Sequence, residues 1–232
     1  MLTKIRNAIK ARTTLGVRRA LKALLTELRS QARHRRAVRM AKRVSPSSGL
    51  KLHLGCGPNC KAGWINIDLL AEGVDLALDL REPLPFPDSS VTDVYSEHVI
   101  EHFEQADAIR LLHESWRVLV PGGLMSVGFP DAEEELLAYA HGREEYFQTE
   151  RERLYELRHA TRMQIVNHDF RQWGEHKYAY DLETLTVMLQ EAGFVSIRKR
   201  SFDPMRDSES RRFETMYVDA RKPAGTALPG AA

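Results

Sequence analysis

Residues suited to chemistry gather around one short Gly-Cys-Gly stretch, residues 55–57, which follows the alternating apolar run Leu50–Leu54. The run and the glycines predict a β-strand that feeds a tight loop. Glycines in such a loop lack a Cβ, so backbone amides can lie close to a ligand. Two carboxylates, Asp68 and Asp79, follow at the ends of the next two predicted strands. We therefore expect a ligand site that combines a glycine loop with two acidic side chains.

The elements that must position these groups alternate between strands and crossover segments. We expect strands at 50–54, 64–67, 74–78, 91–95 and 124–129, with a helix over about 99–119. Strands separated by crossovers form a mainly parallel sheet, and ligands bind such sheets beyond the carboxyl ends of the strands. A helix between Asp181 and Gly193 then precedes a final hairpin of 194–202 and 213–220.

Three motifs in this order resemble the class I S-adenosylmethionine (SAM)-dependent methyltransferases. They are the strand followed by Gly-Cys-Gly, the Gly-Trp-Ile-Asn-Ile-Asp segment at 63–68 and the Pro-Leu-Pro-Phe-Pro-Asp segment at 83–88. The chain is most similar to a small subgroup of predicted methyltransferases, type 11-like, whose members often accompany glycan or cell-surface polysaccharide biosynthesis. The resemblance implies an α/β, Rossmann-like sheet of seven strands with helices on both faces and an antiparallel last strand.

The resemblance also implies roles for residues at the strand ends. Asp68 would accept hydrogen bonds from the ribose hydroxyls of SAM, and Asp79 would accept one from the adenine amine. The Leu80 amide would donate to an adenine nitrogen, and the glycine loop would hold the amino-acid end. The predicted cofactor-binding residues are Gly55, Cys56, Gly57, Asp68, Asp79, Leu80 and Glu97. Either aspartate also fits a simpler role as a turn cap, because Asp is common in turns.

Two features depart from the wider class. Only ten residues, 56–65, separate Gly55 from Asn66, whereas a crossover between parallel strands needs a dozen or more. We expect a turn and a short helix in place of the first crossover helix. Cys60 also stands where the third glycine of a G-x-G-x-x-G motif would lie, which argues against an NAD(P) site.

A rival motif follows the fourth predicted strand. Residues 98–102, His-Val-Ile-Glu-His, match the H-x-x-E-H pattern of zinc peptidases, which places two ligands at i and i+4 of a helix. Similar methyltransferases often carry such a sequence without metal, and the sequence assigns no third ligand. Cys56 and Cys60 likewise suit loop packing better than metal binding. We therefore predict no metal site and keep a zinc hydrolase as the last alternative.

Residues 132–180 are predicted to form a lid over the strand ends, helical at 132–163. The run 167–180 is dense in His, Asp, Arg, Trp and Tyr, a mixture that suits a sugar or another polar ring. The candidate catalytic residues are His168, His176 and Asp169, because a hydroxyl acceptor loses a proton as the methyl moves. The same run also suits a surface loop, and methyl transfer can proceed by alignment alone.

Residues 1–48 form a basic arm with its linker. Residues 1–43 carry 14 Lys and Arg and one acid, for a net charge of +13, while the remainder carries −11. Apolar residues at helical spacing predict one or two amphipathic helices before the breaker segment 45–49. The arm suits packing on the acidic domain, adsorption to an anionic membrane surface or, less well, nucleic-acid phosphates; an organelle transit peptide also fits its composition. We expect deletion of 1–43 to spare SAM affinity.

Composition sets the remaining bounds. Of the 232 residues, 43% are hydrophobic, and no apolar run approaches the length of about 20 residues that spans a membrane. Two cysteines are too few for a disulfide framework, so we expect a cytoplasmic protein, peripheral at the inner face of the membrane if the arm adsorbs there. The expected domains are the arm, a methyltransferase domain at 49–221 and a disordered tail at 222–232.

The predicted function is SAM-dependent transfer of a methyl group to an oxygen or nitrogen atom. The acceptor would be a small molecule or a glycan or cell-surface polysaccharide intermediate. The alternatives are an RNA methyltransferase guided by the basic arm and a non-catalytic SAM-binding scaffold.

Overall fold

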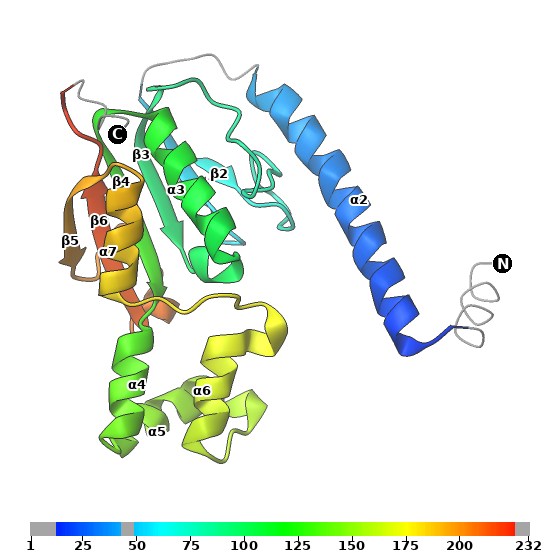
Figure 1. The fold of residues 1–232 in the computed structure, drawn as a ribbon, viewed down its shortest axis with the longest axis vertical. Coiled ribbons are helices and arrows are strands. Elements are labelled where there is room, and N and C mark those ends of the chain that lie inside the picture. The colour runs from blue at the N-terminus through cyan, green and yellow to red at the C-terminus, as the bar shows by residue number, and fades with distance from the viewer. Residues whose placement is uncertain (1–12, 43–48, 226–232) are drawn as a thin grey trace.

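The computed structural model describes residues 13–42 and 49–225, and its centre is a mixed sheet of six strands (Figure 1). The strands are β1 (Leu50–Leu54), β2 (Ile65–Ile67), β3 (Val91–Glu97), β4 (Leu119–Pro130), β5 (Val195–Arg200) and β6 (Thr215–Arg221). Their order in the sheet is β2-β1-β3-β4-β6-β5. Neighbours among β1 to β4 pair in parallel, whereas β6 is antiparallel to β4 and β5. The predicted α/β class and the antiparallel last strand are confirmed.

The strand predicted at 74–78 is wrong, because this segment makes only an isolated bridge between Leu76 and Ile67. The reason lies in Asp75, whose Oδ2 accepts the Asn66 backbone N–H at 2.7 Å and the Asn66 side-chain amide at 3.0 Å. A side-chain acceptor thus takes the place of a strand partner at this point. Within the described residues the sheet therefore has six strands rather than seven.

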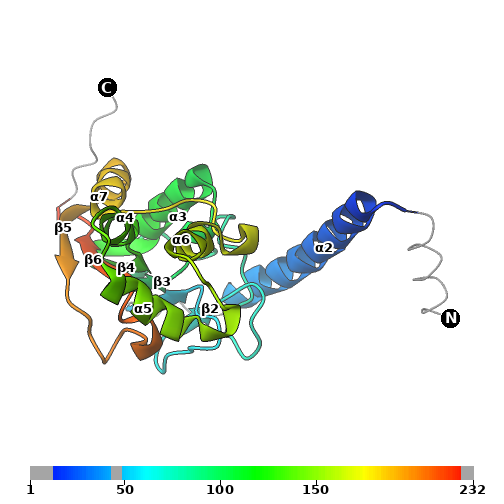
Figure 2. The same cartoon turned by 90° about the horizontal axis from the view of Figure 1, so that it is seen from below.

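One face of the sheet is covered by α3 (Gln105–Val118) and α7 (Leu182–Glu191), as Figures 1 and 2 show. Their buried residues recur every three or four positions, as expected of helices with one side on a core. They are Ala108, Leu111, Leu112, Ser115 and Val118 in α3, and Leu185, Met188 and Leu189 in α7. The single helix predicted over 99–119 is divided, since a short 3₁₀ helix, η1 (Ile100–His102), precedes α3.

Two segments without strands or α-helices, 55–64 and 201–214, cover much of the opposite face, where helices were also predicted; the second contains a 3₁₀ turn, η4 (Glu209–Arg211). The expected short helix within 56–65 is wrong, because this segment consists of turns. The Asn66 side chain explains the turns: it accepts the Lys61 N–H at 2.7 Å and donates to the Lys61 and Trp64 carbonyls. Lys61 Nζ then donates to the Arg206 carbonyl at 2.6 Å, which joins the two segments.

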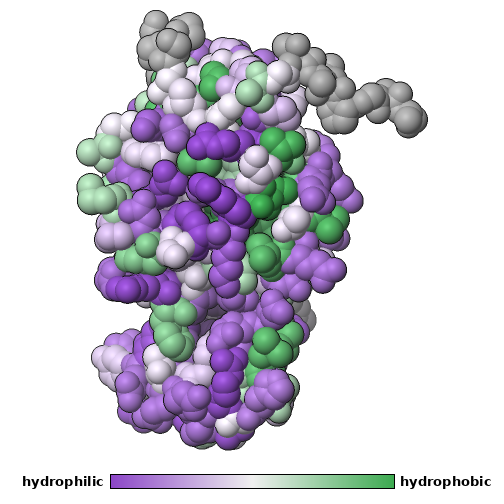
Figure 3. Space-filling view, turned by 90° about the vertical axis from the view of Figure 1, so that its left-hand side faces the viewer, coloured by the Kyte–Doolittle hydropathy of each residue, from purple (hydrophilic) through white to green (hydrophobic). Residues whose placement is uncertain are grey.

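The predicted lid is a separate helical lobe beyond the carboxyl end of β4 (Figures 1 and 3). It consists of α4 (Ala132–Ala140), α5 (Glu144–Arg153), the 3₁₀ turn η2 (Tyr155–Leu157) and α6 (Arg162–Arg171), followed by η3 (Gln172–Gly174). Ala138, Phe147 and Ile165 form a small core of its own. Because α4 begins directly after β4, its N-cap Asp131 places the lobe over the strand ends.

The arm contains one long helix, α2 (Leu15–Ala41), whose N-terminal half projects from the domain (Figures 1 and 2). Its C-terminal half is docked: Ala37 and Ala41 belong to the same hydrophobic core as the sheet. Arg33 donates to the carbonyls of Leu70 and Ala71 at 3.3 and 3.1 Å. The C-terminal half of α2 is therefore part of the domain. The predictions made for residues 1–12 and 43–48 of the arm lie outside the described residues.

The chain end departs from the predicted tail. Lys222 is 8% exposed, and its Nζ donates to the Leu119 carbonyl at 2.7 Å. The ordered domain thus continues past 221, and the rest of the predicted tail, 226–232, lies outside the described residues. None of the described helices is both long enough and apolar enough to span a membrane.

Candidate active site

The two loop glycines have different structural reasons. Gly55 has φ +60°, and a Cβ built on it would lie 2.4 Å from Cγ2 of Val99. Gly57 has φ +51°, and a Cβ on it would have no neighbouring atom within 4 Å. Position 55 therefore requires a glycine, because its backbone packs against the turn between β3 and η1 with no room for a Cβ. The open space beside Gly57 suits the close approach of a ligand.

Asp68 lies next to this loop, as predicted. Its Oδ2 accepts the Gly57 N–H at 3.0 Å, while Oδ1 accepts the N–H groups of Leu70 and Ala71, both at 2.8 Å. The carboxylate thus caps the turn at 69–71 and fixes the glycine loop at the same time. A carboxylate has about four acceptor positions, so Oδ2 retains one for a ribose hydroxyl. Its contact with SAM stays a prediction.

Asp79 is engaged more completely. Its carboxylate accepts the Arg81 N–H at 3.0 Å and the Arg81 guanidinium at 2.6 to 3.2 Å. Burial raises the pKa of Asp79, but the hydrogen bonds from Arg81 outweigh it and the net pKa is lowered. Its backbone N–H donates to His34 of α2 at 3.0 Å. Here the turn-cap role is visible, and a bond to adenine would require Arg81 to move. The neighbouring Leu80 is buried in the core.

Cys56 and Glu97 also face protein partners. The Cys56 N–H donates to the Ile67 carbonyl at 3.1 Å and so joins the loop to β2. Burial, with a contribution from nearby Cys60, raises the pKa of the Cys56 thiol to about 12. Glu97 is buried at the end of β3, where it accepts from the Ser208 N–H at 3.1 Å and the Tyr217 hydroxyl at 3.0 Å.

A small cavity lies between the lid and the strand ends. Its lining includes Glu101, Asp131, Glu135, Asp169, His176 and Glu214, with three tyrosines, Tyr146, Tyr178 and Tyr180. The structure therefore brings together two of the predicted catalytic residues, His176 and Asp169. His168 does not line the cavity: its ring packs against the rings of Trp173 and His159 at centroid distances of 4.8 and 5.3 Å, with Nε2 4.0 Å from the Asp169 carboxylate.

The carboxylates on the lid side gather around one cation, Arg153. Its Nη2 lies 2.5 Å from Glu150, 2.5 Å from Glu214 and 3.6 Å from Asp169. Burial, together with the charges of Glu135 and Glu150, raises the pKa of Asp169 well above its usual range. A carboxyl group that holds its proton at neutral pH cannot act as a base there.

His176 is better placed for proton transfer. Its Nδ1 is bonded to the Asp169 carbonyl, so in the neutral ring Nδ1–H donates and Nε2 carries the lone pair. Burial lowers the pKa of His176, which keeps that lone pair available near neutral pH. Its role as a base stays a prediction.

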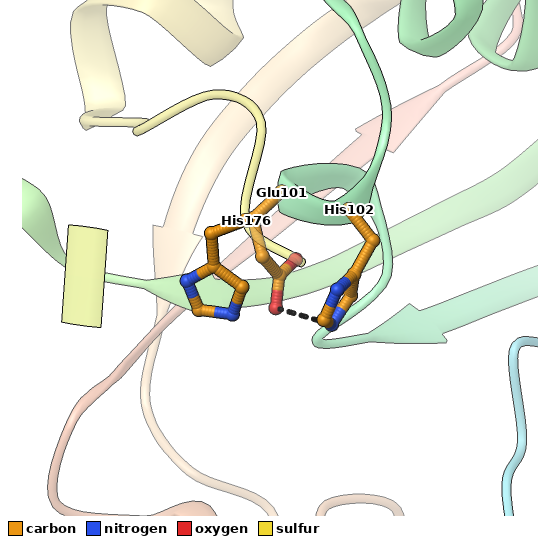
Figure 4. Close-up of side chains that lie close together, drawn as sticks. All are labelled: Glu101, His102 and His176. Carbon is orange, nitrogen blue, oxygen red and sulfur yellow. Dashed lines mark ion pairs between the residues drawn. The ribbon is translucent and has the colours of Figure 1, made fainter. Parts of the chain in front are cut away.

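Glu101 and His102 were not among the site residues predicted from the sequence. Both come from η1 and lie beside His176, which belongs to the segment after the lid (Figure 4). Backbone bonds explain the approach: the Glu101 carbonyl accepts the N–H groups of Lys177 and Tyr178 at 2.7 and 3.3 Å. His98 and His102 do not share an α-helical face, because His98 precedes η1 with φ +54°. Histidine and glutamate in the 98–102 motif were the available signal.

The Pro-Leu-Pro-Phe-Pro-Asp motif has a structural role. Arg117 of α3 donates to the carbonyls of Leu84 and Phe86 at 2.8 and 2.9 Å and pairs with Asp88 at 2.7 Å. Glu114 accepts the Leu84 N–H at 2.8 Å. The motif therefore fixes the chain that leads into β3, and the sequence analysis did not identify its two partners on α3.

Comparison with known proteins gives one sequence match. Residues 52–127 match the family model described as "Methyltransferase domain". These residues include the glycine loop, Asp68, Asp79 and the β3 end, so the match covers the predicted donor site. Among the curated proteins none matches the chain.

Solved structures of methyltransferases resemble the chain remotely. A SAM-dependent methyltransferase from Archaeoglobus fulgidus is 16% identical, with a TM-score of 0.48, over 80% of this chain and 91% of that one. A SAM-dependent methyltransferase from Thermotoga maritima, described as a possible histamine N-methyltransferase, is 18% identical, with a TM-score of 0.46, over 88% and 96%. Phosphoethanolamine N-methyltransferase 2 from Haemonchus contortus, in complex with SAM, is 15% identical, with a TM-score of 0.43, over 82% and 52%. Residues 52–127 therefore match a methyltransferase domain, and this match supports S-adenosylmethionine as the cofactor.

Proposed function

We propose that the protein is a SAM-dependent methyltransferase that acts on an oxygen or nitrogen atom of a small molecule or glycan intermediate. The observation that supports this most directly is the position of the methyltransferase match. It contains the Gly57–Asp68 contact of 3.0 Å, which joins the loop after β1 to the end of β2.

The residues present fit the donor. The space that a Cβ would take at Gly57 is open, so a ligand can approach the backbone there. Asp68 retains an acceptor position. When bound, SAM supplies an electrophilic methyl group. Val99 packs on Gly55, and Glu101 follows two residues later, at most about 7 Å along the chain. The donor loop and the lid cavity are therefore adjacent, as methyl transfer by alignment requires.

The cavity lining indicates the acceptor class. Carboxyl groups and tyrosines dominate it, and Arg153 is already paired with Glu150 and Glu214. Such a lining favours a neutral or amine-bearing polar acceptor, such as a hydroxylated ring, over a phosphate. The lone pair on His176 Nε2 is suited to take the proton that the acceptor loses. The acidic lining therefore favours a small molecule or sugar over RNA.

Calorimetry with SAM, its demethylated product and NAD tests the donor assignment. We expect SAM and the demethylated product to bind and NAD not to bind. Gly57→Val should abolish SAM binding, because the new side chain fills the open space beside the loop. Gly63→Val is the matched control, since Gly63 also has positive φ and open surroundings. Wild-type protein that ignores SAM would refute the proposal, whereas SAM binding without turnover on any acceptor would favour the scaffold alternative.

We also propose that the projecting half of α2 adsorbs to anionic membrane surfaces. Val17, Leu21, Leu25 and Leu28 are 41 to 54% exposed. At 3.6 residues per turn they lie on the side opposite to the buried Ser30, Ala37 and Ala41. Eight Lys and Arg residues and one Glu occupy Leu15–Ala41. An unpartnered apolar stripe on a cationic helix is typical of helices that lie in an anionic interface.

Vesicle sedimentation tests this second proposal. We expect the protein to bind vesicles that contain phosphatidylglycerol, to ignore pure phosphatidylcholine, and to lose binding in a Leu21→Ser/Leu25→Ser variant. Binding to RNA that weakens steeply with salt, with no vesicle binding, would favour the nucleic-acid alternative. Concentration-dependent dimerisation through the same leucines would assign the stripe to a second copy instead.

A further inference from the structure

Glu101, His102 and His176 form a cluster beside the lid cavity (Figure 4). Methyl transfer that depends only on the alignment of donor and acceptor gives this cluster no role. One ligand-type atom from each residue lies within 4.8 Å of those of the other two. In Figure 4 the Glu101 carboxylate lies between the two imidazoles, which come from η1 and from the segment after the lid. Two elements far apart in sequence thus present a carboxylate and two imidazoles to one point.

Glu101 is the residue that demands a partner. Its side chain is buried, and neither carboxyl oxygen has a hydrogen bond. The nearest basic atoms are His98 Nδ1 at 3.5 Å and His102 Nε2 at 3.9 Å, both beyond hydrogen-bond geometry. Leaving a buried carboxylate unpaired is costly, so such a group in a folded protein holds a proton or binds a cation.

The orientation of His176 favours a cation. Its Nδ1 is bonded to the backbone carbonyl of Asp169, which leaves Nε2 with a lone pair. A metal-binding histidine almost always donates its other ring N–H to a carbonyl or carboxylate in this way. The ring of His102 packs edge-to-face against that of His176, with the ring centroids 4.9 Å apart. The backbone therefore fixes the imidazole of His176, and the ring contact places His102 beside it.

His98 adds a third lone pair on the protein side. The Thr215 hydroxyl donates to the Arg211 carbonyl at 2.5 Å, so its oxygen accepts from His98 Nε2–H at 2.7 Å. Nδ1 of a neutral His98 then carries a lone pair directed at Glu101. Lone pairs on imidazole and carboxylate face one another, with no protein donor between them among the described contacts.

The second cluster of possible ligands in the described chain provides a contrast. Glu150, Asp169 and Glu214 also bring their oxygens together. There Arg153 already supplies a positive charge, with Nη2 at 2.5 Å from both glutamates. No comparable side-chain cation pairs with Glu101 among the described ion pairs, in which only histidines approach it.

We propose that Glu101, His102 and His176 bind one divalent transition-metal ion, such as Zn²⁺ or Mn²⁺. Two imidazoles and one carboxylate with an open side are a ligand set of catalytic zinc and non-haem metal sites. Ligands about 2.1 Å from a tetrahedral ion lie about 3.4 Å apart. The His102–Glu101 distance of 3.9 Å is close to this value, so a small rotation of the half-buried imidazole closes the site.

The catalytic consequence rests on the proposed methyltransferase function. A metal ion here would face the lid cavity, where an acceptor hydroxyl can take the open coordination position. Coordination would lower the pKa of a bound hydroxyl and so prepare its oxygen to attack the methyl group. The O–H proton leaves to solvent or a lid carboxylate, the O–CH₃ bond forms and the S–CH₃ bond breaks. His176 then serves as a ligand rather than as the general base.

Metal binding is measured on the full chain, purified without a metal-affinity step and treated with a chelator. We expect Co²⁺ to bind at one ion per chain, with visible absorption bands, and Zn²⁺ to displace it. Glu101→Gln and His176→Ala should lose this binding. His113→Ala is the matched control, because His113 is exposed on α3 and should leave Co²⁺ binding unchanged.

The outcomes separate the metal from the donor. Wild-type protein that takes up no Co²⁺, Zn²⁺ or Mn²⁺, or a Glu101→Gln variant that binds them normally, overturns the proposal. If Glu214→Gln loses the binding and His176→Ala keeps it, the ion binds at the cluster of Glu150, Asp169 and Glu214, and the proposal is also overturned. SAM calorimetry on the chelated protein is independent of these results, so a failed metal site leaves the methyltransferase proposal testable on its own.

Discussion

The contact between Gly55 and Val99 yields a quantitative prediction about the glycine loop, residues 55–57. Gly55→Ala introduces a Cβ at positive φ, which costs about 1–2 kcal/mol. It also places that Cβ 2.4 Å from Val99 Cγ2, and such overpacking costs about 1–3 kcal/mol more. Gly57→Ala meets the first cost only, since nothing lies within 4 Å of its Cβ. We therefore expect Gly55→Ala to destabilise the protein by about 2–5 kcal/mol and Gly57→Ala by about 1–2 kcal/mol.

Val99→Ala provides the decisive test, because it removes the atoms that the new Cβ meets. Alone it should cost about 2 kcal/mol through lost burial and a small cavity. Combined with Gly55→Ala it should cost less than the sum of the single changes, with a favourable coupling of about 1–3 kcal/mol. The assay is urea unfolding of all four proteins, and SAM calorimetry on those that fold. Gly57→Ala should lose more SAM affinity than stability.

Two results would refute this reasoning. Strict additivity of Gly55→Ala and Val99→Ala would show that the two residues do not touch in solution. Equal destabilisation by the Gly55 and Gly57 changes would show that the loop conformation, rather than packing, decides both. Either result would remove the structural link between the donor loop and the turn that leads to Glu101.

Four further predictions follow from single contacts. Asp68→Asn, which loses the charge-assisted bond from Gly57, should cost about 2 kcal/mol in urea unfolding and weaken SAM binding, whereas no loss of stability would contradict the 3.0 Å contact. Arg117→Lys should destabilise nearly as much as Arg117→Ala, by about 2–4 kcal/mol, because one ammonium cannot reach both carbonyls that the guanidinium holds; full rescue by lysine would argue against this. Burial, with nearby Lys61, lowers the pKa of His53 to about 4, so the unfolded chain takes up the proton at a higher pH than the folded protein does. The contribution of His53 to the free energy of unfolding is therefore present above about pH 6.5, and about 3 kcal/mol of it is lost as the pH drops to 4. A His53→Gln variant should show a smaller fall. Deletion of 1–43 should reduce both Tm and SAM affinity, contrary to the expectation from sequence, while deletion of 1–26 should not.

The sheet was predictable wherever its signals were local. Alternating apolar residues ending at a glycine identified β1, and the strand predicted at 124–129 is the C-terminal half of β4, which begins earlier, at Leu119. The strand at 74–78 was not predictable in this way, because its apolar pattern is sound. Its pairing with β2 is limited to the bridge at Leu76, because the Asp75 carboxylate binds the Asn66 backbone. Competition between a side chain and a backbone ladder depends on geometry that a pattern does not contain.

The site was predictable as a set of residue types more than as a set of contacts. Gly57 and Asp68 meet as expected, because both follow strand ends that are neighbours in the sheet. The Asp79 carboxylate is bonded to Arg81, and the Asp79 N–H donates to His34 of α2. Neither partner is evident from the spacing of acidic residues. The 98–102 motif was recognised, but the ligand-like partner of Glu101 and His102 is His176, which only the return of the chain from the lid brings near.

The short first crossover has a consequence on the far side of the sheet. With only turns between β1 and β2, the strand residues of that face need another cover. Arg200, Asp207 and Tyr95 provide it: the guanidinium pairs with Asp207 at 2.6 Å, and the Tyr95 hydroxyl donates to the same carboxylate at 3.1 Å. Glu97 joins this network through Ser208 and Tyr217. A residue expected to bind SAM thus secures the 201–214 segment, because its buried carboxylate finds its hydrogen-bond partners in and beside this connection, which covers the face where a helix was expected.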